Sequence, residues 1–138
     1  MKKVFLFIVT ALMVGYVFVS CKKSDKKTTQ LTVLQRIQAK WGIESVIDHE
    51  HLTAGFDTTV TSAGTASDYV DFRSDGKVYF SFGGTSDTTT YALVGDTSIL
   101  IQLVGTYKIQ TLTDNQLKLY TKEEDASGYL EEYLNLKK

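Results

Sequence analysis

The feature that most restricts the fold of this chain is a two-residue alternation of apolar and polar side chains. In residues 77–82, a valine and two phenylalanines occupy every second position. The same alternation places Ile99, Ile101 and Leu103 together. Because successive side chains of a β-strand point to opposite faces, the pattern predicts a sheet with one apolar and one wetter face.

The alternation predicts eight strands, at residues 43–51, 67–73, 77–83, 89–94, 97–104, 106–112, 116–123 and 129–136. Short connections with turn residues, such as Ser74-Asp75-Gly76, favour hairpins and therefore an antiparallel meander. Closure into a barrel would bury the apolar face and remove exposed edges. We therefore expect an all-β, up-and-down barrel of about eight strands, with a two-sheet sandwich as the alternative. Residues 52–66 are polar and without sustained alternation, which predicts a long polar loop, with an irregular strand within it as the alternative.

A short helix is predicted before the strands. Apolar residues recur there at spacings of three, three and four, at Leu31, Leu34, Ile37 and Trp41. Thr28 or Thr29 could cap this helix, and Gly42 could end it. We expect its apolar side to cover one mouth of the barrel.

Charge and cysteine content limit what the folded part can do. Residues 28–138 contain 9 Lys and Arg against 15 Asp and Glu, a net charge of −6. Such a domain would repel phosphate backbones, so we do not expect nucleic-acid binding. The single cysteine rules out an intramolecular disulfide, and the length suits one domain.

The beginning of the chain has the pattern of an export signal. Lys2 and Lys3 precede an uncharged, mostly apolar run at residues 4–19, which is short for a spanning helix of roughly 20 residues. Ser20-Cys21 follows, and this boundary resembles the lipobox of bacterial lipoproteins. In those proteins the cysteine thiol is acylated, for example with palmitate, and the chain is cut before the cysteine. An uncleaved anchor helix with an incidental cysteine is the alternative.

The resemblance implies residues 1–20 as a signal peptide, Cys21 as the lipidated residue and residues 21–30 as a polar tether. Residues 31–138 would then form the folded domain. We expect a cell-envelope protein held on the outer membrane by its lipid, with the membrane as a partner; the membrane face and the oligomeric state stay open.

The domain itself resembles the lipocalin-like lipoproteins of Bacteroidetes-type bacteria. The segments that carry the likeness are Ala39-Lys40-Trp41, residues 71–77, residues 91–96 and residues 107–119. The family implies an eight-stranded calyx in which Trp41 would plug the barrel base. Strict lipocalins have Gly-x-Trp at this point and a late arginine over the tryptophan. Here Ala39 replaces the glycine, and Arg73 is the only arginine after Arg36.

Few residues suggest chemistry. His49 and His51 would share one strand face and could bind zinc with a third ligand. The sequence supplies no spaced third ligand, so we expect a solvated pair and no metal or other cofactor. Nucleophile and phosphate-loop motifs are missing from the sequence, which favours a non-enzymatic protein.

Tyrosines are the other candidates. Turned inward, they would line a cavity for a small hydrophobic or amphipathic ligand, at Tyr69, Tyr79, Tyr91, Tyr107, Tyr120 and Tyr133. A filled barrel that contacts protein or glycan through its loops is the alternative. Thr58 and Thr88, each in an Asp-Thr-Thr triplet of a predicted loop, resemble bacterial O-glycosylation acceptors.

Overall fold

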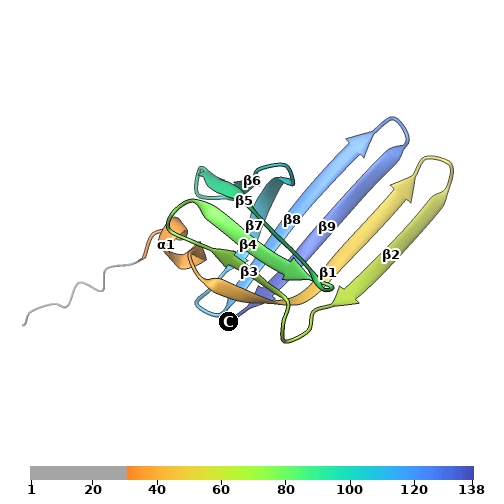
Figure 1. Ribbon diagram of the computed structural model, residues 1–138. Coiled ribbons are helices and arrows are strands. Elements are labelled where there is room, and N and C mark those ends of the chain that lie inside the picture. The colour runs from red at the N-terminus through yellow and green to blue at the C-terminus, as the bar shows by residue number, and fades with distance from the viewer. Residues whose placement is uncertain (1–30) are drawn as a thin grey trace, which may run out of the picture.

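The computed structural model describes residues 31–138, and these form a closed antiparallel barrel of eight strands with one additional strand (Figure 1). The prediction of an all-β, up-and-down barrel is therefore confirmed. The predicted signal peptide, the predicted lipidation site at Cys21, the predicted tether and the two suggested helix caps at Thr28 and Thr29 lie outside the described residues. No helix within residues 31–138 is long and apolar enough to cross a membrane.

The elements follow one another along the chain with short connections. They are α1 (Val33–Ile37), β1 (Lys40–Leu52), β2 (Phe56–Ala63), β3 (Tyr69–Phe72), β4 (Lys77–Phe82), β5 (Thr85–Val94), β6 (Ser98–Ile101), β7 (Gly105–Leu112), β8 (Gln116–Asp125) and β9 (Gly128–Lys137). Strands β3 to β9 pair in sequence order, and β9 pairs with β1 to close the barrel.

Strand β1 changes its neighbour along its length. Its first residues, Lys40 to Gly42, pair with β3, whereas residues 45–52 pair with β2. On its other side β1 pairs with β9 almost throughout. As a result the second half of β1 leaves the barrel wall and continues into a projecting sheet.

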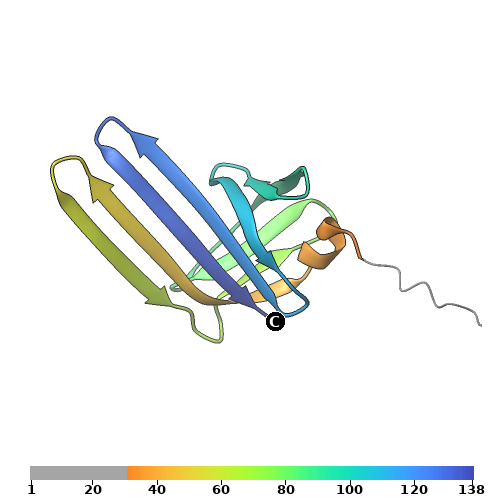
Figure 2. The same ribbon diagram turned by 180° about the vertical axis from the view of Figure 1, so that it is seen from behind.

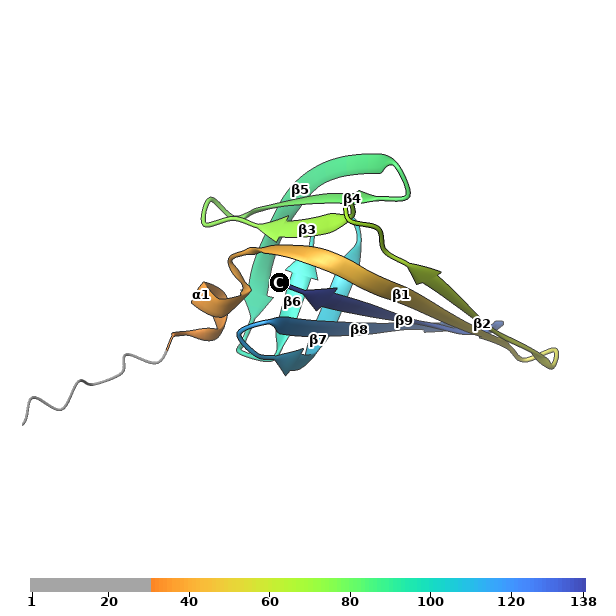
Figure 3. The same cartoon turned by 90° about the horizontal axis from the view of Figure 1, so that it is seen from below.

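We call this projecting sheet the wing. It contains β2, residues 45–52 of β1, residues 128–135 of β9 and residues 121–125 of β8, in the order β2-β1-β9-β8. Figures 1 and 2 show these strands extending beyond the part of the barrel formed by β3 to β7, and Figure 3 shows the wing on the side opposite α1.

The segment predicted mainly as a loop, residues 52–66, contains the regular strand β2. The segment forms a hairpin with β1, in register from Leu52 opposite Phe56 to Ser45 opposite Ala63. Its side chains are mostly exposed on both faces. A strand that buries neither face needs no apolar alternation, so the signal used to find the other strands was missing here.

The core fills the end of the barrel next to α1. Its largest fully buried side chains include Trp41, Phe72, Leu117 and Leu136. The inward positions predicted from the alternation supply most of it, because each strand turns every second residue inward.

Helix α1 covers this end, but it is shorter than predicted. Thr32 and Gln35 form a capping box at its start, and the helix ends at Ile37. Trp41 belongs to β1 instead, and its indole Nε1 donates a 2.8 Å hydrogen bond to the Ile37 carbonyl. Leu31 and Leu34 are 54% and 40% exposed, so the predicted apolar stripe is only partly buried.

Several strand limits differ from the prediction, and two of them change the predicted turns. Gly83 and Gly84 both have positive φ and form a two-residue turn, so β5 already begins at Thr85. Strand β6 ends at Ile101, and Leu103 lies in the following turn with φ 68° and 94% of its surface exposed. Leu103 therefore does not share the buried face of Ile99.

Candidate ligand-binding site

The barrel is hollow on the side away from α1. A cavity of about 250 Å³ lies there, and its lining has nine apolar and two polar residues. Phe80 and Phe82 of β4, Val46 of β1, Leu134 of β9 and Val104 after β6 contribute to the apolar part. At the α1 end Trp and Phe side chains fill the space between the strands. Towards the wing the interior is not filled, although Phe80 and Phe82 of β4 are among its inward residues.

The two polar residues of the lining contact each other. The Tyr107 hydroxyl of β7 donates a 2.8 Å hydrogen bond to Glu132 Oε1 of β9. Burial raises the pKa of Tyr107, and the charge of Glu132 raises it further. Burial also raises the pKa of Glu132; the hydrogen bond from Tyr107 opposes this rise, whereas the charges of Asp48 and Glu123 add to it. The cavity thus has one polar point in an apolar wall.

Glu132 stands where the cavity meets the wing. It lies directly opposite Asp48 of β1 in the strand register, so both side chains belong to the same face of the sheet. We call this the inner face of the wing, because it continues the barrel interior. None of the ion pairs formed within residues 31–138 involves Asp48, Glu123 or Glu132.

The outer face of the wing carries the two histidines. His49 Nε2 and His51 Nδ1 lie 2.9 and 3.0 Å from the two carboxylate oxygens of Asp57, on β2. His49 Nδ1 also lies 3.3 Å from Glu131 of β9, which accepts a 2.8 Å hydrogen bond from the Tyr120 hydroxyl. This network faces away from the cavity, because residues 49 and 48 point to opposite sides of β1.

Hydrogen bonding shifts the pKa values of the outer-face network. The hydrogen bonds to Asp57 and then Glu131 raise the pKa of His49. The hydrogen bonds from His51 and His49 lower the pKa of Asp57. The hydrogen bond to Glu131 raises the pKa of Tyr120 to about 12.

The histidine pair is thus engaged with carboxylates rather than simply solvated. Asp57 could not be found from sequence because its strand was predicted as a loop. Within the described part of the chain, no group of three or more His, Cys, Asp or Glu is arranged to hold a metal ion.

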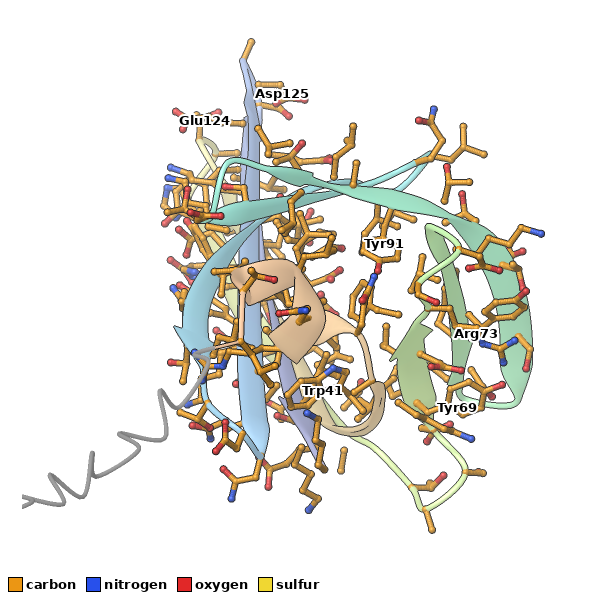
Figure 4. All side chains as sticks on the ribbon, turned by 90° about the vertical axis from the view of Figure 1, so that its left-hand side faces the viewer. Trp41, Tyr69, Arg73, Tyr91, Glu124 and Asp125 are labelled. Atoms are coloured by element: carbon orange, nitrogen blue, oxygen red, sulfur yellow. The ribbon has the colours of Figure 1, made fainter. Side chains whose placement is uncertain are left out.

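Of the six tyrosines expected around a cavity, the structure places Tyr107 in its wall. Tyr91 points into the barrel at the filled end, where its hydroxyl donates to the Arg73 carbonyl (Figure 4). Tyr69 and Tyr79 lie outside, stacked under Lys40 and Arg73.

Tyr120 and Tyr133 pack together on the outer face, with ring centroids 4.9 Å apart. Strand parity explains these outward positions: the neighbours Val70, Val78, Leu119 and Leu134 take the inward ones.

Trp41 is completely buried beneath α1, as Figure 4 shows. The cation over its ring is the Lys138 ammonium, 4.2 Å from the ring centroid, and not an arginine. Arg36 instead donates to the Leu112 carbonyl at 2.7 Å, and Arg73 pairs with Asp71.

Thr58 and Thr88 lie in strands β2 and β5, not in the loops predicted for them. Thr88 is exposed and Thr58 is half-buried.

Sequence reasoning missed Glu132 and Asp48. A signal existed for Glu132: it falls on the same parity as Leu130, Leu134 and Leu136, so a carboxylate on an apolar face could have been noticed. Asp48 had no such signal, because its position opposite Glu132 depends on how β1 and β9 pair.

Compared with known proteins, the sequence matches no family model and no curated protein.

Proposed function

We propose that this protein binds a small, largely apolar molecule in the barrel cavity. The observation that carries the proposal is the cavity of about 250 Å³, with nine apolar lining residues and the Tyr107–Glu132 pair as its polar point. Ligand sites typically combine a mostly apolar concave wall with a few placed polar groups, in volumes of roughly 300–1,000 Å³. The volume of this cavity lies just below the lower limit of that range and therefore suits a small ligand.

The same observation favours binding over catalysis. The lining provides apolar surface and one hydrogen-bonded pair, and it contains no Ser, Thr, Cys, His or Lys. The alternative is a non-enzymatic envelope protein whose barrel is solid and whose loops contact protein or glycan. A void at the mouth of the barrel gives the ligand-binding proposal the stronger support.

We also propose that the domain is lipid-anchored at Cys21 after removal of residues 1–20, and that it works in the cell envelope on the outer membrane. The support is in the sequence: the uncharged run at residues 4–19 ends in Ser20-Cys21, and a polar, lysine-rich stretch follows. Several acyl chains would anchor the protein stably, whereas a single chain binds only marginally.

The binding proposal is tested with a cavity-blocking variant. Val104 lines the cavity and is 44% exposed, so Val104→Trp can place a large ring over the opening with little disturbance of the core. Val94 is similarly exposed, at 51%, but lies outside the lining, which makes Val94→Trp the matched control.

The lipid-anchored chain on phosphatidylcholine vesicles is dialysed against octanol, with protein-free vesicles as the reference. We expect saturable uptake by the wild type and Val94→Trp, and a loss of at least tenfold in affinity for Val104→Trp. No saturable uptake by the wild type, or equal uptake by both variants, would overturn the proposal. Native mass spectrometry of protein from its own host should also show a co-purifying small molecule.

A further inference from the structure

We propose that the cavity selects a ligand with a protonated amino group attached to an apolar body. This inference rests on the proposed function and specifies its ligand class. It is carried by the apolar cavity together with the arrangement of carboxylates where the cavity opens onto the wing.

Glu132, at the polar point of the cavity, is a hydrogen-bond acceptor with no cationic partner among the described residues. Glu132 receives one hydrogen bond, from the Tyr107 hydroxyl to Oε1, and no other side chain of the described residues donates to it. A carboxylate can accept several hydrogen bonds, and an ammonium group carries three donors. An amine in the cavity would therefore complete the Glu132 site, and the bond would be charge-assisted.

A second carboxylate stands beside the first. Asp48 and Glu132 are direct cross-strand partners on the inner face, and like charges in this position destabilise a sheet. Within residues 31–138 neither takes part in an ion pair. A ligand cation between them would replace this repulsion by attraction.

The basic residues of the wing all lie on its outer face, together with Asp57, Glu124 and Glu131, so only the inner face carries charges of one sign. Alternation puts Asp48, Glu50, Glu123, Asp125 and Glu132 on the inner face, with no Lys, Arg or His among its residues. The wing's basic residues, His49, His51 and Lys122, are on the outer face. Beyond the cavity, Glu50, Glu123 and Asp125, together with Glu124 of the outer face, line a hollow of about 290 Å³ near the tip of the wing; Figure 4 labels Glu124 and Asp125.

This arrangement of charges decides between ligand classes. A one-signed surface around an apolar opening concentrates ions of the opposite sign and repels those of the same sign. A fatty acid would bring a further carboxylate beside Glu132 and Asp48, so it should bind poorly. A neutral alcohol would gain the apolar contacts but no charge attraction, and an amine would gain both.

The test compares three ligands with the same eight-carbon chain: octylamine, octanol and octanoate. Each is dialysed at pH 7 against the lipid-anchored protein on uncharged phosphatidylcholine vesicles. We expect octylamine to bind at least about tenfold tighter than octanol, and octanoate to bind most weakly. The preference should shrink as salt is added, because salt screens partly exposed charges.

Glu132→Gln should reduce the ratio of octylamine to octanol affinity from about ten to about one, and Asp48→Asn should reduce it in part. The matched control is Glu44→Gln. It removes the same charge from an exposed residue that pairs with Lys137 and does not line the cavity, so the ratio should stay at the wild-type value.

The outcomes separate the two proposals. Equal binding of all three ligands, or an amine preference that survives Glu132→Gln, would overturn the amine selectivity while cavity binding still stands. Failure of all three ligands to bind saturably would overturn cavity binding itself, and the selectivity with it.

Discussion

Trp41 offers the sharpest test of how the closed end of the barrel is held together. Its side chain is completely buried, its indole donates to the Ile37 carbonyl at 2.8 Å, and the Lys138 ammonium lies over its ring. Trp41→Ala would remove the largest side chain of the core and the bond that ties α1 to β1. Truncations of this kind cost about 3–5 kcal/mol. A domain of this size is stable by about 5–15 kcal/mol, so much of its stability would be lost.

A second substitution divides this loss into its parts. Trp41→Phe keeps an aromatic ring in the core but leaves the Ile37 carbonyl without its donor. One hydrogen bond contributes about 0.5–1.5 kcal/mol, and the smaller ring leaves some space, so we expect a loss of about 1–2 kcal/mol. Leu103→Ala is the control, because Leu103 is 94% exposed and contributes little to the core.

The assay is urea unfolding followed by far-UV circular dichroism. Fluorescence would not serve, because Trp41 is the only tryptophan. With a slope of about 1.5 kcal/mol per molar urea, Trp41→Ala should lower the midpoint by about 2–3 M. A loss below about 1 kcal/mol for Trp41→Ala, or equal losses for Trp41→Ala and Leu103→Ala, would refute the assigned role of Trp41.

Two further predictions concern the junction of barrel and wing and the outer face. A Cβ at Gly64 would collide with the Ile43 carbonyl, whereas a Cβ at Gly42 would make an ordinary 3.6 Å contact with the Lys137 carbonyl. Gly64→Ala should therefore lower the free energy of unfolding, measured in urea, by about 1–3 kcal/mol more than Gly42→Ala. The hydrogen bonds that raise the pKa of His49 in the folded state should stabilise the fold. Their contribution should be complete below pH 6.5, the pKa of an unfolded histidine, and should disappear as the pH rises through the folded pKa. His49→Gln should therefore flatten the pH dependence of stability above pH 6.5; an unchanged dependence would contradict the network.

The strands with one buried face could be predicted from the sequence. Val78 and Phe80 alternate with outward residues, and the positive φ of Gly76 agrees with the predicted hairpin. Strand β2 was not accessible, because a strand that buries neither face carries no apolar period. The predicted helix was too long because Trp41 continued its apolar spacing, although Trp41 belongs to β1, where it is paired with Val70 of β3.

The candidate site was less accessible than the fold. Tyrosines were natural candidates for a lumen, yet five of the six lie outside the cavity lining. Parity alone could have placed Tyr79 outside, since Val78 and Phe80 turn inward. The cavity itself depends on how the inward side chains of several strands meet, and no single segment reveals that.

Taken by itself, the sequence determined the strand character of the chain, which face of most strands is buried, and the hairpins that join neighbours. These properties are local, because side-chain direction alternates within a strand and turn residues act over a few positions. Only the tertiary structure decided where β1 exchanges β3 for β2, that the barrel is hollow at one end, and that Asp48 faces Glu132. These depend on pairing between distant segments, where register decides which side chains meet.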